Sequence, residues 1–465
     1  MSSEMTSAYR PAEAFRRGSY HFPHGLKHNL LWYGARRLRP LDPLKFFSQL
    51  AREFGDIAHY QLGAKHIVFL SNPEYIREVL IVQHSNFIKE RTQQRARILL
   101  GEGMITADGA VHRKQRQVAQ PAFHRQQVPA YVDEIVRRAA ALRDRWREDE
   151  TLDVYREMMH LTLGTVSATL FNFELGEEVV PLNAGVGDIM QVYNALVLLP
   201  GINLLLGVPF TPLRKFVHAR ARLDATISRM IAERRKATAR GAAEGRDLLP
   251  FMLASQAEMG WTDRDLRDQV ITIFLAGYET MAIALTWTWY VLSQNPDARE
   301  RMYAEVDAVL GSRAATCDDL PKLRYTEMVL AESMRLYPPA WAMGRQALAD
   351  FELGPYRLPA GTTVLMSQFV THRDPRYYPK PLRFDPERFT PEAKAARPRF
   401  SYFPFGMGPR QCIGEAFAWM EGVLVLATFA QRWRLEHVEG HKVEPQPLFT
   451  LRPKNGMPMR VAACR

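Results

Sequence analysis

The strongest constraint on the fold is a largely apolar run from Val270 to Leu292, which is long enough to cross a bilayer as one helix. Glu279 lies inside this run, with Gly277 and Thr280 close on either side. A carboxylate at the centre of a bilayer is costly and rare. We therefore predict a long helix buried in the core of a large protein, and hydropathy alone leaves a membrane span open as the alternative.

The rest of the chain can surround such a helix, because 465 residues with a 47% share of hydrophobic residues are ample for a large core. No repeat and no clear linker divides the sequence, so we predict one domain over residues 1–465 that is mainly α-helical with small β-sheets. Its predicted parts are a β-rich N-terminal part at about 40–75, a helical core at about 76–340, a meander with a cysteine loop at about 374–414, and a C-terminal hairpin at about 447–461.

Periodicity and turn residues predict individual elements in the first two thirds. Apolar residues on both sides of Gly63 predict a hairpin over Ile57–Leu70. Thr262 and Asp265 have the spacing of a capping box at the start of the longest helix. Apolar residues at helical spacing predict further helices at residues 128–147, 155–171 and 216–236.

The last third of the chain changes character. Prolines are dense between Pro338 and Pro409, which predicts a long irregular segment. A helix is predicted from Gly414 to about Arg432, and Asn455-Gly456 predicts the turn of a final hairpin over Leu448–Val461.

The chain is basic, with 61 Lys and Arg against 50 Asp and Glu and a net charge of +11. Such an excess suits nucleic acid, an anionic membrane surface or an acidic protein partner. The charges are spread along the chain without a basic arm or a nucleic-acid-binding signature, so we expect no nucleic acid partner. An acidic protein partner is favoured, and a membrane surface is the second alternative.

The cysteine content and the N-terminus bear on the compartment. Three cysteines form no disulfide framework, which suits a reducing cytosol. Met1–Arg17 is polar and has no apolar stretch typical of a signal peptide. We therefore expect a soluble, cytoplasmic protein, and we expect a monomer.

Cys412 stands in the most informative segment, Phe403-Pro-Phe-Gly-Met-Gly-Pro-Arg-Gln-Cys-Ile-Gly414. Glycines and prolines predict a tight loop that ends at the start of a helix, where free N–H groups and the helix dipole favour a thiolate. A thiolate can bind haem iron and promote O–O cleavage, and Arg410 could meet a haem propionate. A lone cysteine is usually buried and inert, and we keep that interpretation for Cys317 and Cys464.

The pattern Phe-Gly-x-Gly-x-Arg-x-Cys-x-Gly, which runs from Phe405 through Gly406 to Gly414, resembles the haem-binding loop of the cytochrome P-450 superfamily. Three further motifs match that family in the same order along the chain. They are Ala276-Gly277-Tyr278-Glu279-Thr280, Glu332-Ser333-Met334-Arg335 and Arg345 after Pro338-Pro339. The resemblance covers nearly the whole chain, and it implies the fold of that family, with haem b between the long central helix and the helix after the cysteine loop.

The resemblance also assigns roles to the residues that match the family's motifs. Cys412 would be the axial iron ligand, with Phe405 packed near its sulfur. Ala276 and Gly277 would leave room for a diatomic ligand beside the long helix, while Thr280 and Glu279 would relay protons to it.

Residues outside the loop would hold the haem propionates. The resemblance gives this role to Arg345 and to Arg116, together with Arg410. The family usually has a tryptophan four residues before the arginine that corresponds to Arg116. This chain has His112 in place of that tryptophan. A ring nitrogen of His112 could still donate a hydrogen bond, and an exposed histidine without this role is the alternative.

Two further groups follow from the resemblance. Glu332, Arg335 and Arg388 would form a buried structural triad that pins the meander to the cysteine loop. The substrate pocket would draw on residues that are mostly apolar, namely Ile98, Leu99, Met104, Ile105, Phe274, Trp341, Ala342, Met343 and Phe449. Such a pocket indicates a fatty acid or a terpenoid-like substrate. The apolar segment Leu196–Phe210 would form an access lid, with a buried helix pair as the alternative, and a peripheral membrane contact there is a further option.

The implied activity is a monooxygenase that inserts one oxygen atom of O2 into a C–H bond of an apolar substrate. Nothing in the sequence resembles a flavin or iron–sulfur module, so a separate ferredoxin or flavodoxin-type donor is implied. Arg113, Lys114 and other basic residues on the cysteine side could dock an acidic donor. A peroxide-using peroxygenase or isomerase is one alternative, and a non-enzymatic haem protein is another. The intact Glu279-Thr280 pair argues against both.

Overall fold

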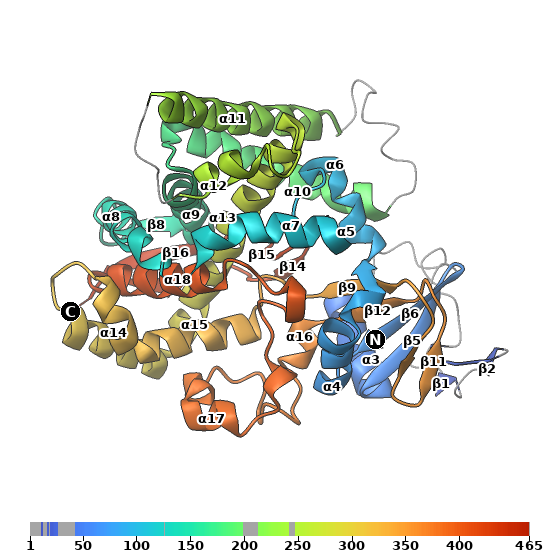
Figure 1. Cartoon of the computed structure of the whole chain (residues 1–465). Helices are drawn as coiled ribbons and strands as arrows, with labels where there is room; N and C mark the ends of the chain where they lie inside the picture. The colour runs from blue at the N-terminus through green and yellow to red at the C-terminus, as the bar shows by residue number, and fades with distance from the viewer. Residues whose placement is uncertain are drawn as a thin grey trace. The chain divides into compact units, whose positions relative to one another are not determined.

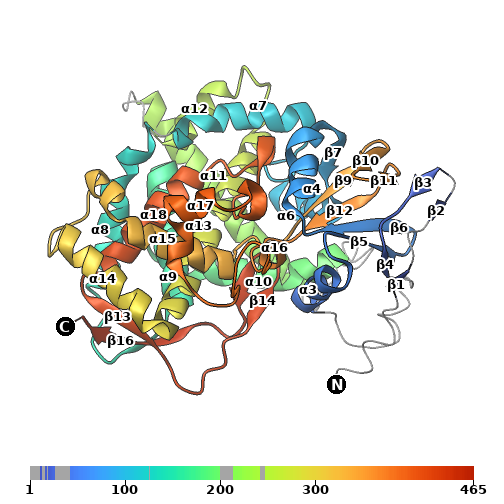
Figure 2. The same cartoon turned by 90° about the horizontal axis from the view of Figure 1, so that it is seen from below.

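The structure is a computed structural model, and it describes residues 11–12, 16–17, 19–26, 42–124, 126–198, 213–240 and 247–464. The chain divides into two compact units. Unit 1 comprises Met1–Gln93, Ala340–Arg383 and Pro391–Cys412, and unit 2 comprises Gln94–Pro339, Phe384–Thr390 and Ile413–Arg465. The predicted class is confirmed, because helices dominate and the sheets are small (Figures 1 and 2).

Unit 1 is built around a seven-stranded sheet with the strand order β1-β4-β5-β6-β12-β9-β7. Its strands are β1 (Pro11–Ala12), β4 (Gly25–Leu26), β5 (Ile57–Leu62), β6 (Lys65–Leu70), β7 (Phe87–Lys89), β9 (Met343–Ala347) and β12 (Thr363–Met366), beside a smaller sheet of β2 (Arg16–Arg17), β3 (Tyr20–His21), β10 (Phe351–Leu353) and β11 (Tyr356–Leu358). Its helices and helical turns are α3 (Pro43–Phe54), α4 (Pro73–Arg77), η1 (Glu78–Val82), η2 (His84–Asn86), α16 (Gln368–Thr371), α17 (Pro391–Ala395), η9 (Arg399–Ser401) and η10 (Gly408–Arg410).

Alternation along the central strands gives the large sheet two apolar faces. On β6, Val68 and Leu70 belong to one buried cluster, whereas Ile67 and Phe69 belong to the cluster on the opposite face. This two-residue period is the one that a pleated strand imposes. Strands β5 and β6 pair antiparallel with Ile57 opposite Leu70, so the predicted hairpin is confirmed.

Unit 2 is mainly helical. Its helices are α6 (Arg97–Leu100), α7 (Gly109–Ala119), α8 (Val132–Arg143), α9 (Val154–Phe171), α10 (Val179–Leu198), α11 (Leu213–Ala239), α12 (Leu248–Ser255), α13 (Asp263–Gln294), α14 (Pro296–Leu310), α15 (Arg324–Leu336) and α18 (Glu415–Ala430), while α5 (Arg91–Arg95) lies at the boundary of the units. Short turns are η3 (Gln120–Phe123), η4 (Val128–Tyr131), η5 (Gly176–Glu178), η7 (Cys317–Lys322) and η8 (Pro386–Phe389). Its strands are β8 (Thr151–Asp153), β13 (Trp433–His437), β14 (Pro445–Pro447), β15 (Leu451–Pro453) and β16 (Pro458–Ala463).

Helix α13 is the centre of unit 2, with α9, α15, α18 and α11 packed against it (Figures 1 and 2). Thr262 and Asp265 form the predicted capping box at its start. The helix is long and apolar enough to span a membrane, but 83% of its most apolar window is buried inside the protein. The prediction of a long core helix is therefore confirmed.

The structure corrects two expectations for the last third of the chain. The proline-rich stretch is not irregular throughout, because β9, β10, β11 and β12 lie within residues 343–366. The final hairpin is also wrong: β15 pairs with β14, while β16 pairs with β13 and β8. Gly456 does adopt a left-handed turn with φ +71°. The chain reverses there, but the strands on either side find partners in different sheets, and the turn residues do not encode this choice.

Candidate active site

The predicted site residues are distributed over both units, and the cysteine loop lies in unit 1. Gly408 has φ +67° and approaches the carbonyl of Leu80 so closely that a Cβ atom would lie 2.3 Å from that oxygen. The Cys412 N–H donates to the Phe405 carbonyl over 2.9 Å, which closes the loop. Phe403 and Met407 anchor the loop because both are buried in the apolar cluster of the large sheet.

Cys412 itself is accessible. Its side chain is exposed, it takes part in no disulfide, and α18 begins three residues later with Gly414 at its N-cap. Phe405 and Gly406 are half-buried next to it along the loop, as is Arg410 at the end of η10. An exposed sulfur before a helix N-terminus, held by a rigid glycine loop, fits a thiolate ligand to a metal-bearing cofactor.

Arg345 lies in the middle of β9 and is 7% exposed. Its Nη1 donates to the Gly344 carbonyl over 2.8 Å. Glu90 is also buried nearby: burial raises the pKa of its carboxyl group, while the N–H groups of Thr92 and Gln93 and the charge of Arg345 act in the opposite direction. The sequence did not reveal this acidic neighbour, which shares Arg345 with any cofactor carboxylate.

The pocket residues predicted from the same unit are Trp341, Ala342 and Met343, and all three are half-buried. Trp341 stacks on Phe47 with ring centroids 6.1 Å apart. The methyl carbon of Met343 lies 3.5 Å from the position that a Cβ of residue 406 would take. Met343 thus lies beside the cysteine loop, as a pocket residue near the cofactor should.

In unit 2 the accessible part of α13 is short. Ala276, Gly277 and Thr280 are half-buried, whereas the residues from Leu266 to Leu275 are buried except Arg267. The Thr280 hydroxyl donates to the Ala276 carbonyl one turn earlier over 2.8 Å. Ala276 and Thr280 therefore share one helix face, which is half-buried in the middle of a helix whose neighbouring residues are mostly buried.

Gly277 has a packing role that the sequence did not indicate. A Cβ atom at this position would lie 3.1 Å from Cγ2 of Val166 on α9. The missing side chain lets α9 pack closely, and Thr162 of α9 donates to the Tyr278 carbonyl over 2.9 Å at the same level. Gly277 thus serves helix packing, and its expected place beside a diatomic ligand stays a prediction. The sequence could not show this because it does not reveal the partner helix.

Glu279 is buried and paired. It is 3% exposed, and its Oε1 accepts hydrogen bonds from Thr450 Oγ1 at 2.5 Å and from Arg452 Nε and Nη2 at 2.8 and 2.7 Å. Thr450 and Arg452 are site residues that sequence reasoning missed. An arginine between the apolar residues Leu451 and Pro453 was the available signal.

The other pocket residues of unit 2 belong to the segment before α7 and to α13. Leu99 and Met104 are buried, Ile98 and Ile105 are half-buried, and Phe449 is half-buried. The segment is tied to α13 because the Glu102 N–H donates to Asp268 Oδ2 over 2.9 Å. Phe274, in contrast, is 0% exposed and packs against Phe171 of α9 and Tyr278. It is thus placed in the helix core rather than on the open face of α13.

His112 and Arg116 lie one turn apart on α7. His112 is 5% exposed, so the alternative of an exposed histidine does not hold, and Arg116 is half-buried. Their neighbours Arg113 and Lys114 are exposed. Helix α7 therefore has a covered face with His112 and Arg116 and an outer face that is basic.

The structure brings Glu332, Arg335 and Arg388 together. Arg335 Nε and Nη2 donate to the two carboxylate oxygens of Glu332 over 2.6 and 2.8 Å, and Arg388 Nε lies 3.4 Å from Glu332 Oε1. The Asp385 N–H adds a hydrogen bond of 2.9 Å. Burial raises the pKa of Glu332, whereas its arginine partners oppose the shift. This cluster joins α15 to η8.

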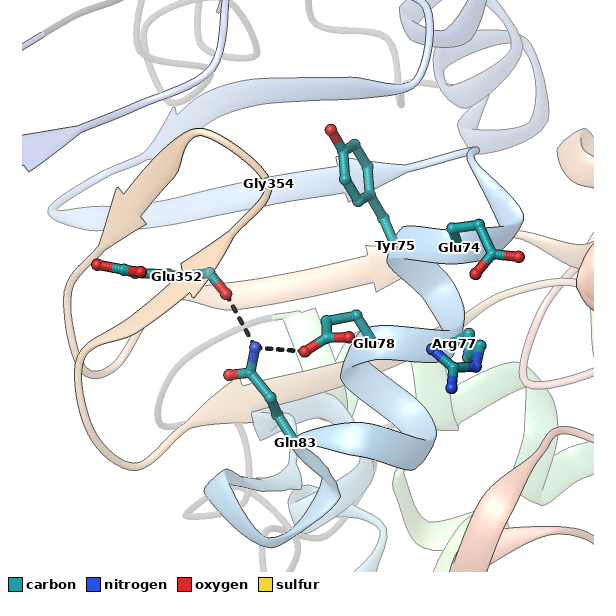
Figure 3. Close-up of a pocket in the computed structure, with 7 residues that line it drawn as sticks. All are labelled: Glu74, Tyr75, Arg77, Glu78, Gln83, Glu352 and Gly354. Carbon is teal, nitrogen blue, oxygen red and sulfur yellow. Dashed lines mark hydrogen bonds between the residues drawn. The ribbon is translucent and has the colours of Figure 1, made fainter.

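A surface pocket of about 420 Å³ lies elsewhere in unit 1 (Figure 3). It is lined by Glu74, Tyr75, Arg77, Glu78, Gln83, Glu352 and Gly354. Gln83 Nε2 donates to Glu78 Oε1 and to the Glu352 carbonyl, each over 2.9 Å. The pocket is open and polar, and none of the predicted site residues lines it.

Comparisons with known proteins agree with the motifs. Residues 21–459 match the family model described as Cytochrome P450. Cyclooctatin synthase of Streptomyces melanosporofaciens is 38% identical over 90% of this chain and 91% of its own length. Cyclooctat-9-en-7-ol 5-monooxygenase of the same organism is 36% identical, with 86% of each chain covered, and Pentalenene oxygenase of Streptomyces avermitilis is 33% identical over 93% and 94%. The chain therefore belongs to the cytochrome P450 family and is a haem-thiolate monooxygenase, an oxidoreductase that incorporates oxygen from O2.

Proposed function

We propose that this monooxygenase hydroxylates an apolar substrate of the terpenoid class, with haem b as its cofactor and a separate ferredoxin or flavodoxin-type protein as its electron donor. Fatty acids are the second substrate class. The observation that carries the proposal is the half-buried group on α13, where Ala276 and Thr280 interrupt a run of buried residues and the Thr280 hydroxyl donates to the Ala276 carbonyl. The names of the relatives, which include Pentalenene oxygenase, favour terpenoids over fatty acids.

We assign the residues that would hold the cofactor by the family motifs that they match. Cys412 would bind the iron through its accessible sulfur, and Arg345, Arg410, Arg116 and His112 would meet the propionates. The bound haem supplies the oxygen-activating chemistry. Each turnover consumes one O2, two electrons and two protons, and it releases water with the hydroxylated product.

The protein's own groups would bind the substrate and move the protons. Leu99, Met104 and Met343 would present apolar surface to a substrate that lacks charged groups. Thr280 Oγ1 would pass protons, because its hydroxyl can both donate and accept hydrogen bonds. Glu279 would supply them, since it directly precedes Thr280 on α13. The segment proposed as an access lid is Leu196–Phe210. Its residues after 198 lie outside the described part of the chain.

A spectral binding screen tests the substrate class. The ferric protein is titrated with sesquiterpenes, diterpenes and fatty acids, and displacement of water from the iron changes the visible spectrum. We expect saturable spin-state changes with terpenoids at lower concentrations than with fatty acids. Tighter binding of fatty acids would reverse the proposed order, and no change with either class would contradict an apolar substrate.

A turnover experiment distinguishes the proposed oxygenase from the peroxide-using alternative. The preferred ligand is incubated with NADPH, a ferredoxin reductase and a ferredoxin, or with hydrogen peroxide alone. We expect product in the first mixture, with one oxygen atom from labelled O2. Product formation with peroxide alone, and none with the electron-transfer proteins, would identify a peroxygenase instead. Mass analysis of the extracted cofactor tests for unmodified haem b.

A further inference from the structure

The strand β15 lies along α13 beside the proposed proton relay. Thr450 precedes this strand and Arg452 is its second residue, and both side chains reach Glu279 of α13. Both partners and the carboxylate belong to unit 2. The contact therefore joins the acid of the relay to a segment about 170 residues further along the chain.

The carboxylate is held through one of its two oxygens. Thr450 Oγ1, Arg452 Nε and Arg452 Nη2 all donate to Oε1, at 2.5, 2.8 and 2.7 Å. Among the hydrogen bonds of the described residues, none ends on Oε2. A carboxylate oxygen with three donors is fixed in place, so Glu279 is restricted to one orientation with Oε2 directed away from its partners.

The partners are themselves fixed by the residue between them. The Leu451 N–H donates to the Pro339 carbonyl over 2.9 Å, and Trp287 Nε1 of α13 donates to the Leu451 carbonyl over 2.8 Å. Trp287 lies eight residues after Glu279, so α13 contacts the strand at two levels. Residues 450 and 452 cannot move away from Glu279 unless these two hydrogen bonds of the Leu451 backbone break.

The charge at this position is enclosed. Arg452 is 7% exposed; burial alone would lower the pKa of its guanidinium group, but the Glu279 carboxylate raises it above its usual value. Burial raises the pKa of the Tyr278 and Tyr155 hydroxyls, and the charges of Glu279 and Arg452 also act on both. Asp153 at the surface also acts on Tyr155. Both tyrosines thus stay neutral, and Arg452 supplies the positive charge that keeps a carboxylate at this depth.

We propose that Arg452 and Thr450 are positioning residues for proton delivery by Glu279, which rests on the proposed role of Glu279 in the relay. By fixing Oε1 they present Oε2 to water. A proton from water then binds Oε2, and the same oxygen releases it to the water that leads to Thr280, so the carboxylate returns to its charged form. Without the hydrogen bonds from Thr450 and Arg452, the carboxylate has several orientations. Electrons that reach oxygen are then lost as hydrogen peroxide.

The test compares variants of the haem-loaded enzyme. Thr450→Val removes one donor at nearly equal volume, and Thr450→Ser restores the hydroxyl. Arg452→Met removes the charge, and Arg452→Lys retains it without the forked geometry. Coupling is measured as product formed per NADPH consumed, together with hydrogen peroxide yield, solvent deuterium isotope effect and thermal unfolding temperature.

Two matched controls separate positioning from stability. Arg234 and Asp247 form another ion pair, with side-chain exposures of 9% and 4% that equal those of Arg452 and Glu279. Arg234→Met therefore reports the general effect of losing a buried arginine. Thr326 donates to Glu305 Oε2 over 2.7 Å, so Thr326→Val is the control for Thr450→Val.

We expect Thr450→Val to lower coupling by roughly threefold to tenfold and to raise the solvent isotope effect, with recovery in Thr450→Ser. Arg452→Met should lose more coupling, and Arg452→Lys less. Arg234→Met and Thr326→Val should lower the unfolding temperature without changing coupling. If Arg452→Met does not fold, the pair Thr450→Val and Thr450→Ser decides the question.

Glu279→Gln is the reference that separates two kinds of failure. If Glu279→Gln retains full coupling, then the relay role in the proposed function is wrong. If Glu279→Gln is uncoupled while Thr450→Val and Arg452→Met are coupled like the unmodified enzyme, then only the positioning role is wrong. A fall in unfolding temperature alone, equal to that of Arg234→Met, would make the contact purely structural.

Discussion

The three cysteines show how the surroundings of a single residue decide its chemistry. Cys464 is half-buried against the Ala430 carbonyl, and burial raises the pKa of its thiol to about 11. Cys412 has the same side chain, but it is exposed at the end of a glycine loop and just before a helix. Cys412 therefore differs from Cys464 in combining access with a backbone environment that favours the thiolate.

Replacing this sulfur should abolish the thiolate signature. We expect Cys412→Ser to lose the thiolate-specific Soret band of the reduced carbon monoxide complex, because a serine oxygen does not supply the same ligand. Cys464→Ser is the matched control and should retain the band. Persistence of the band in Cys412→Ser would remove Cys412 from the iron.

Glu421 on α18 makes the protein sensitive to pH. It is fully buried, neither carboxyl oxygen has a hydrogen-bond partner among the described residues, and burial raises its pKa from 4.5 to about 8. Between these two values the folded protein keeps the proton and the unfolded chain loses it. The free energy of unfolding therefore falls as pH rises from 4.5 to 8, by about 3 kcal/mol at pH 7.

We expect Glu421→Met to flatten this dependence, so that its stabilising effect is small at pH 4.5 and grows toward pH 8. Urea unfolding of both proteins at a series of pH values measures the difference. Glu300→Gln, at an exposed carboxylate of α14, should leave the slope unchanged. A constant difference between Glu421→Met and the unmodified protein at all pH values would show that Glu421 does not titrate in this range.

At the scale of elements, the Glu332 cluster shows how a buried charge group joins segments. Glu332 and Arg335 lie on one face of α15, and Arg388 and Asp385 approach from η8 and the residue before it. The i,i+3 spacing in the sequence already predicted that Glu332 and Arg335 lie together. Arg388 is 56 residues away from Glu332 along the chain, and the family resemblance rather than the spacing pointed to it.

Removal of the shared carboxylate should be costly. We expect Glu332→Gln to lower the free energy of unfolding by about 3–5 kcal/mol and to reduce haem content, because two buried guanidinium groups lose their counter-charge. Arg301→Gln breaks an exposed pair with Glu387 in the same region and should cost less than about 1 kcal/mol. Chemical denaturation and haem titration measure both effects, and equal costs would contradict the buried-charge argument.

The segment before α7 depends on a glycine for its contact with α13. A Cβ at position 103 would lie 1.9 Å from Thr272 Oγ1 and 2.4 Å from the Asp268 carbonyl oxygen. We expect Gly103→Ala to destabilise the protein by about 1–3 kcal/mol and to weaken substrate binding, because the segment must move. A Cβ at position 187 inside α10 would meet no described atom within 4 Å. Gly187→Ala should therefore stabilise the protein by about 0.5–1 kcal/mol. Thermal unfolding that ranks the two variants the other way would contradict this packing.

At the scale of the whole molecule, the net charge of +11 favours association with an acidic electron donor. Arg113 and Lys114 are exposed on the basic face of α7. We expect Arg113→Glu to slow reduction by an acidic ferredoxin about tenfold at low salt, and added salt should slow the unmodified protein. Arg264→Glu changes the net charge equally at another exposed position, so it is the control. Equal effects of the two reversals would exclude docking at α7.

Local patterns predicted the elements whose signals lie within a few neighbouring residues. These include the β5–β6 hairpin, the capping box of α13 and the glycine loop before α18. Predictions failed where the answer depends on a distant partner. The strands on either side of Gly456 pair in different sheets, which the turn residues do not encode. Phe274 was assigned to the pocket although α9 covers it.

The sequence by itself determined the long core helix, the cysteine loop and the family, because each depends on residue types at short, fixed spacings. Only the tertiary structure decided which groups surround each reactive side chain. Arg452 and Thr450 meet Glu279, and Glu90 lies beside Arg345, through contacts between segments far apart in the chain. Burial and pairing set the charge and orientation of a side chain, and both depend on the whole packed core rather than on neighbouring residues.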